Sequence, residues 1–158
     1  KKYKKIKMNE FTLCDFKKAI KYVHYVRISR EKNKIQGKIQ PIGTIYMFMD
    51  KKTEKQIYFG ECHRNPTPQT NVATRILAHI ETITNLGLMP KYKENDLRKM
   101  LYDYKIYSVY EFFKNWKVYI IKNFYNKNFE DMKEQLKKVE SKYTVLTNQK
   151  FGGANVRI

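Results

Sequence analysis

The chain has 158 residues, and its 33 lysines and arginines against 15 aspartates and glutamates give a formal net charge of +18 at pH 7. A hydrophobic content of 42% excludes a disordered basic tail, and two cysteines are too few for a disulfide framework. The longest purely apolar stretch, 45–49, is far too short to span a membrane. We therefore expect a folded cytoplasmic domain with a polyanionic partner and no membrane partner.

The first predicted helix follows a basic arm at residues 1–8. Thr12 followed by Asp15 is a capping pair, which predicts a helix over 13–31. Its apolar residues recur at helical spacing and form one face, at Phe16, Ile20, Val23 and Val26. This apolar stripe is a candidate contact for a homodimer, and packing on the monomer's own sheet is the alternative.

A β-hairpin is predicted next in the chain. Residues 43–50 are rich in strand formers, 51–55 make a polar connector, and 56–61 form the partner strand. The Asn-Pro-Thr-Pro run within 64–71 predicts a loop, and 72–84 a helix after it.

The rest of the chain predicts a helix over 93–104, a third strand over 116–124 and an amphipathic helix over 128–143. The element order predicts an α/β (α+β) fold, with a small three-stranded antiparallel sheet flanked by helices. We divide the chain into a basic arm and helical extension, 1–40, and a second unit, 41–158.

Three motifs of the second unit carry side chains suited to phosphate chemistry. Tyr46 ends a Gly-Thr-Ile-Tyr motif in one strand and Tyr58 opens a Tyr-Phe-Gly motif in its partner. Two tyrosines in facing strands, each near a glycine, can line one surface that a ligand approaches closely. Arg75 and His79 lie four residues apart, and therefore on one face of the next helix.

Two further residues complete the pattern: Glu140 on the closing helix and Asn155 after a glycine pair. In the order G-(T)-I-Y, Y-F-G, R-x-x-x-H, E and N, the motifs over 42–158 resemble the GIY-YIG nuclease superfamily. The chain departs from the family pattern at the extra Thr44, at Phe59, and in a longer stretch before the arginine. The resemblance implies a three-stranded antiparallel sheet flanked by helices, and cleavage of DNA phosphodiester bonds with a divalent metal.

The resemblance assigns a role to each motif residue. It implies that Tyr46 is a general base, whose phenolate the positive surroundings would favour, and that Tyr58 orients the water or binds the phosphate. It implies that Arg75 grips the scissile phosphate, with Arg64 in the longer stretch as a rival. It implies that His79 donates to the phosphate or relays a proton.

The metal ligand implied by the resemblance is Glu140, followed by Asn155 in the family's asparagine position. A single carboxylate suits Mg²⁺ or Mn²⁺, which prefer oxygen ligands and retain water. We further expect DNA contacts from basic and histidine side chains near these motifs, at Arg64, His63, Lys133 and Lys137. Tyrosines at 102, 104, 107 and 110 are expected to pack against the sheet, with stacking on bases as the alternative.

The function that the resemblance implies is a metal-dependent DNA endonuclease, encoded by a bacterium or a phage, with sequence-specific double-strand cleavage of the type II restriction kind. The alternatives are a phage, homing or other mobile-element nuclease, a structure-specific nuclease, and a non-catalytic DNA-binding module with the same fold. The chain ends three residues after Asn155, so we expect DNA reading from the N-terminal helix, 61–74 and 85–115.

Overall fold

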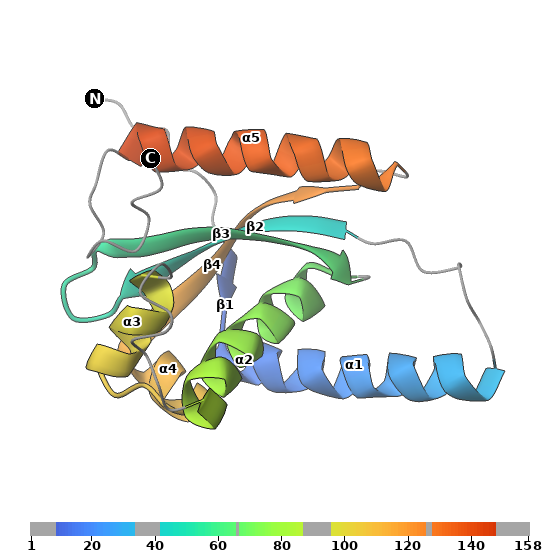
Figure 1. The fold of residues 1–158 in the computed structure, drawn as a ribbon, viewed down its shortest axis with the longest axis horizontal. Helices are drawn as coiled ribbons and strands as arrows, with labels where there is room; N and C mark the ends of the chain where they lie inside the picture. The colour runs from blue at the N-terminus through green and yellow to red at the C-terminus, as the bar shows by residue number, and fades with distance from the viewer. Residues whose placement is uncertain (1–8, 34–41, 66, 87–95, 126–127, 148–158) are drawn as a thin grey trace.

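A computed structural model describes residues 9–33, 42–65, 67–86, 96–125 and 128–147 of the chain. These residues form a mixed α/β fold in which an antiparallel sheet has α5 on one side and α1 to α4 on the other (Figure 1). None of the helices described is long and apolar enough to cross a membrane. The elements are β1 (Asn9–Phe11), α1 (Leu13–Asn33), β2 (Ile42–Asp50), β3 (Gln56–Asn65), α2 (Pro68–Leu86), α3 (Asp96–Asp103), α4 (Val109–Asn115), β4 (Trp116–Phe124) and α5 (Phe129–Thr147).

The sheet has four strands in the described residues, in the order β1-β4-β2-β3, and every neighbouring pair is antiparallel. The predicted class is confirmed, but the predicted number of three strands is wrong. The missed strand, β1, has only three residues, too few to display the alternation that marks a strand. It forms because Phe11, opposite Val118 in β4, is buried in the core.

The predicted loop over 64–71 is also wrong, because β3 extends to Asn65 and α2 begins at Pro68. Thr67 and Thr70 cap the helix: the Thr70 amide donates to Thr67 Oγ1 (3.1 Å), and the Thr67 amide donates to Thr70 Oγ1 (3.2 Å). Proline is well suited to the first turn of a helix, where its missing N–H would have no partner. Pro68 therefore opens the helix, although we predicted a loop at this position.

The capping pair predicted for α1 is confirmed. The Asp15 amide donates to Thr12 Oγ1 (3.2 Å), and the Thr12 amide donates to the Asp15 carboxylate (2.9 Å). Phe16 is buried, with its ring 5.9 Å from that of Phe113, and Ile20 packs against the same core. This half of the apolar stripe is therefore occupied within the monomer and is not a contact for a second copy, whereas the Val26 side chain lies outside the described residues.

Two apolar clusters hold the layers together. The larger lies between the sheet and the α1 to α4 side, around Phe48, Phe112 and Trp116. The smaller is formed by Ile45 of β2 with Met132 and Leu136 of α5. The two clusters fix helices on both sides of the β2–β3 hairpin, where the predicted site residues lie.

Candidate active site

The two motif tyrosines lie on one face of the hairpin. Tyr46 in β2 is paired with Gly60 in β3, and Phe48 is paired with Tyr58. A Cβ atom added at Gly60 would lie 2.5 Å from Tyr46 Oη and 2.6 Å from Tyr58 Cε2. Glycine is therefore needed at position 60 because both rings extend over it, with their centroids 6.2 Å apart.

Tyr46 is completely buried, and its hydroxyl has no hydrogen-bond partner in the described part of the chain. Burial raises the pKa of Tyr46 well above its usual value, and the neighbouring Tyr58 raises it further, whereas Arg75 lowers it. Loss of solvation outweighs the positive charge, so Tyr46 is a neutral phenol. The prediction that the surroundings favour its phenolate is wrong for this state of the protein.

Arg75 reaches the same place from α2. Its side chain is half-buried, and Nη2 donates to the carbonyl oxygen of Glu61 at 3.3 Å. Burial alone would lower the pKa of Arg75, but Tyr46, Cys62, Tyr58 and Glu61 act in the opposite direction and the net pKa is raised. The guanidinium therefore carries a full positive charge beside the Tyr46 hydroxyl.

Asn71, one turn before Arg75, fixes α2 on the hairpin. Its Nδ2 donates to Thr44 Oγ1 at 3.1 Å and to the carbonyl oxygen of Ile42. Thr44, the residue that departs from the family motif, is fully buried and serves as this anchor. The spacing of four residues then places Arg75 on the same helix face, directed at the hairpin.

His79 lies one further turn along α2 and is almost fully buried. Its Nδ1 accepts a hydrogen bond from Arg98 Nε (3.1 Å), so its proton lies on Nε2, which has no partner among the described residues. Burial, with smaller effects from Arg98 and Arg75, lowers the pKa of His79 to about 3. His79 is therefore neutral at physiological pH, and its ring packs edge-on against Tyr58 at 6.4 Å.

Glu140 approaches from α5, on the side of the sheet opposite α2 (Figure 1). A side chain at Gly43 would collide with Leu136, so the glycine of the first motif lets α5 pack directly on β2. Glu140 follows Leu136 by one turn and is buried. The Glu140 carboxylate raises the pKa of Tyr46, and its effect is the smallest of those that act on this tyrosine. Glu140 therefore lies within electrostatic reach of the tyrosine hydroxyl.

The structure thus brings together Tyr46, Tyr58, Arg75 and His79 on the α2 side of the sheet. Glu140 lies on α5, across the sheet (Figure 1), and acts on Tyr46 through its charge. The remaining predicted site residues are placed differently. The Arg64 side chain and Asn155 lie outside the described residues. His63 lies in β3 rather than in a loop, with Nδ1 2.8 Å from Glu61 Oε2 and its ring 5.1 Å from that of Phe129. His63 is therefore held by contacts within the protein.

The two predicted lysine contacts lie on α5. Lys133 pairs with Glu130 at 3.3 Å and lies over the Phe129 ring, and Lys137 is exposed. Both remain open to an approaching anion, because neither pairing nor packing buries them.

Three residues of the site were missed from the sequence. Cys62 and Glu61 act on the pKa of Arg75, and Arg98 donates to His79. Strand alternation could have placed Cys62 on the same face as Tyr58, since the two are four residues apart in β3. No local sequence pattern predicts that Arg98 contacts His79, because the two residues are 19 positions apart.

The described residues contain no group of three or more histidine, cysteine, aspartate or glutamate side chains arranged to hold a metal ion. Glu140 is therefore a candidate ligand as a single carboxylate. Comparisons with models of known protein families, with curated proteins and with solved structures give no significant match.

Proposed function

We propose that this protein is a divalent-metal-dependent DNA endonuclease of the GIY-YIG type. One observation carries the proposal: Tyr46 and Tyr58 extend over Gly60, Arg75 binds the carbonyl of the next residue, Glu61, and the Glu140 charge acts on Tyr46. These residues come from four elements spread over 95 positions of sequence, from 46 to 140. Three of the motifs that carry the resemblance therefore lie close together in space, and the charge of a fourth, Glu140, reaches them, which supports a shared active site.

Arg75 is the group best placed to bind the scissile phosphate. It is permanently charged, and the residue as a whole is only partly buried. A guanidinium can donate two parallel hydrogen bonds to phosphoryl oxygens and stabilise the charge that develops on them. The contact with the Glu61 carbonyl and the α2 anchor at Asn71 hold this donor in position.

Tyr46 would take a proton from the attacking water, as the resemblance implies. Its hydroxyl is buried and neutral, so DNA binding must first open a path to it. Arg75 already lowers the pKa of Tyr46, and any further positive charge brought beside it would lower this pKa more. Tyr58, packed between Tyr46 and His79, would hold the ring of Tyr46 in place.

The donor set fits Mg²⁺ or Mn²⁺ held by Glu140. These ions are commonly bound by one or two carboxylates, with water and substrate phosphate as further ligands. A bound cation would supply positive charge to the phosphoryl oxygens and make a bound water more acidic.

Within this proposal, we favour double-strand cleavage of the type II restriction kind, in which two copies act on the two strands. One observation favours a second candidate function, DNA binding without cleavage: the Tyr46 hydroxyl lies buried behind the hairpin glycine. A nuclease assay separates the two functions.

The test is cleavage of supercoiled plasmid DNA by the parent, by Arg75→Ala and by Lys142→Ala, with Mg²⁺ and with excess chelator. Lys142 is exposed on α5, and its replacement by alanine removes one positive charge, as Arg75→Ala does. We expect cleavage by the parent and by Lys142→Ala with Mg²⁺ only, and a loss in Arg75→Ala of about 10²- to 10³-fold. An inactive parent that still binds the plasmid would favour the non-catalytic module.

A further inference from the structure

Four tyrosines between 102 and 110 are exposed, contrary to the prediction that they pack against the sheet. Their exposed fractions are 39% for Tyr102, 62% for Tyr104, 41% for Tyr107 and 67% for Tyr110. Four large aromatic side chains open to solvent within nine residues are an unusual concentration, and such a surface commonly marks an interaction site. We call these four residues the tyrosine surface.

The turn that carries the tyrosine surface is rigid. At the end of α3 the Ile106 amide donates to the Leu101 carbonyl (2.8 Å) and the Lys105 amide to the Tyr102 carbonyl (3.0 Å), with Lys105 in the left-handed region. This is a Schellman cap, and both Leu101 and Ile106 are buried in the core. The cap fixes the backbone between Leu101 and Ile106, which carries Tyr102 and Tyr104, so little backbone entropy remains to be lost there when a ligand binds.

The rings of the tyrosine surface also support one another. Tyr107 packs edge-on against Tyr102 at 6.3 Å and donates its hydroxyl to the Tyr102 carbonyl (3.4 Å). Tyr104 packs edge-on against the buried Trp116 at 6.4 Å. Three of the four rings are therefore held by neighbouring aromatic groups.

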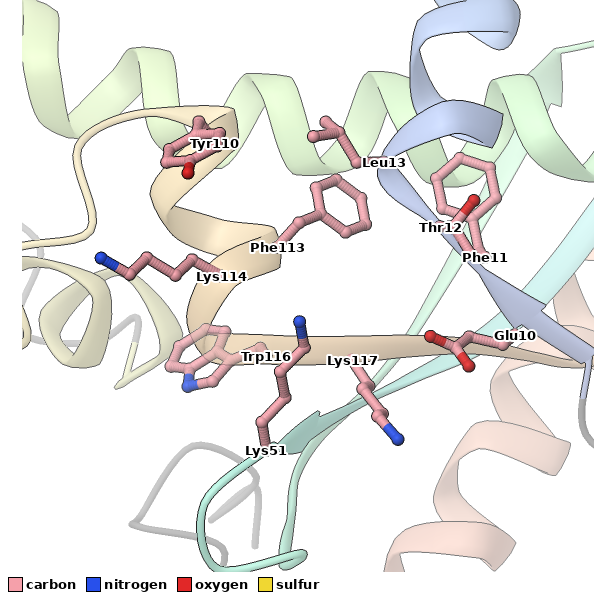
Figure 2. Close-up of a pocket in the computed structure, with 10 residues that line it drawn as sticks. All are labelled: Glu10, Phe11, Thr12, Leu13, Lys51, Tyr110, Phe113, Lys114, Trp116 and Lys117. Carbon is pink, nitrogen blue, oxygen red and sulfur yellow. The ribbon is translucent and has the colours of Figure 1, made fainter.

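A positively charged pocket of about 370 Å³ adjoins Tyr110 (Figure 2). Its aromatic lining includes Phe113 and Trp116, and lysines from the hairpin turn, α4 and β4 surround it, at Lys51, Lys114 and Lys117. Glu10 is the single acidic residue that lines it, so the lining carries a net positive charge. The Lys51 amide donates to the Asn115 carbonyl (3.0 Å), which fixes the hairpin turn against the end of α4.

We propose that the tyrosine surface and this pocket bind a single-stranded segment of DNA, with bases stacked on the tyrosines and phosphates held by the three lysines. Stacking requires bases whose faces are free, and the bases of a duplex are covered by their neighbours. A ligand bound through its phosphates alone would contact the lysines, but it would give the four exposed tyrosine rings no role in binding. The choice of DNA rests on the proposed function.

The pocket is separate from the candidate active site. The pocket lies beside the edge strand β1, whereas Arg75 contacts Glu61 in β3, the opposite edge of the sheet. Single-strand binding can therefore be measured without metal and without cleavage.

The test is fluorescence anisotropy with a labelled oligo-dT of about 12 nucleotides and with an abasic strand of the same length, both without metal. Tyr104→Ala and Tyr110→Ala are compared with Tyr22→Ala and Tyr125→Ala, which remove exposed tyrosines elsewhere. We expect affinity for oligo-dT to fall about tenfold in each surface variant and to change less than about twofold in the controls. All variants should bind the abasic strand equally, because they retain every lysine.

Equal affinities of surface and control variants for oligo-dT would overturn the proposal. An equal loss on the abasic strand, or on a duplex of the same length, would also overturn it, because neither probe offers free base faces. Arg75→Ala should bind oligo-dT like the parent, so a failure of the nuclease proposal leaves this result intact. Trp116 is the only tryptophan of the chain and lines the pocket, so its fluorescence should change with oligo-dT and not with the abasic strand.

Discussion

Because the hydroxyl of Tyr46 is unpaired among the described residues, the removal of this one oxygen atom should change the stability and the activity of the protein in opposite directions. Tyr46→Phe removes only Oη, which is fully buried and has no hydrogen-bond partner in the described residues. A buried polar group without a partner costs about 1–3 kcal/mol of stability. Because the ring and its packing on Phe48 and Tyr58 are retained, the substitution should recover much of that cost.

We therefore expect Tyr46→Phe to raise the free energy of unfolding by about 1 kcal/mol. For a chain of this length, that gain corresponds to a rise in Tm of about 2–4 °C. Under the proposed function, the same variant should lose DNA cleavage, because the general base is gone. Thermal unfolding followed by circular dichroism and a plasmid cleavage assay measure the two effects on one preparation.

The pH dependence supplies a second check on the same side chain. The pKa of Tyr46 is raised in the folded protein, so above pH 10 the unfolded chain loses this proton first. The stability of the parent should therefore decline above pH 10, and the advantage of Tyr46→Phe should widen there. A Tm that falls by several degrees in Tyr46→Phe at neutral pH would refute the reasoning, since it would mean that the hydroxyl is satisfied.

Three further predictions concern the neighbours of this site. The pKa of His79 is lowered to about 3, so stability should fall as the pH drops below 6.5. The free energy of unfolding should fall by about 2 kcal/mol between pH 7 and pH 5. Urea unfolding of His79→Gln at the two pH values should not show this fall. Equal losses in the parent and the variant would contradict a buried neutral histidine. Gly60→Ala should lower the free energy of unfolding by about 1–3 kcal/mol, because the new Cβ would overlap the Tyr46 and Tyr58 rings; an unchanged Tm would contradict this packing. Asn71→Ala should lower stability by about 1–3 kcal/mol, because Thr44 Oγ1 loses a buried partner, whereas the exposed Gln69→Ala in the same helix should change it by less than about 0.5 kcal/mol.

The parts of the fold that were predicted correctly depend on local signals. The strand formers of 43–50, with the polar connector after them, predicted the hairpin, the Thr12–Asp15 pair predicted the start of α1, and the strand predicted at 116–124 is β4 as observed. The spacing of Arg75 and His79 placed both on one helix face. These features follow from helix and strand periodicity within a short window.

The failures depend on partners far away in sequence or on position within an element. Pro68 indicates a loop until its place in the first turn of α2 is known. The burial that keeps Tyr46 neutral depends on its register opposite Gly60, which the sequence does not define. The exposure of Tyr104 and Tyr110 depends on which side of α3 and α4 faces the core, and α4 itself is only seven residues long.

The most direct test of the central claim is the metal dependence of cleavage in Glu140→Gln and Glu134→Gln. Both variants replace a glutamate of α5 by its neutral isostere, but Glu140 is buried within electrostatic reach of Tyr46 and Glu134 is exposed. We expect Glu140→Gln to lose cleavage over a full Mg²⁺ titration while it keeps the parent's affinity for duplex DNA, and Glu134→Gln to cleave like the parent. Cleavage by Glu140→Gln at the parent rate, with the parent's Mg²⁺ dependence, would contradict the proposed active site.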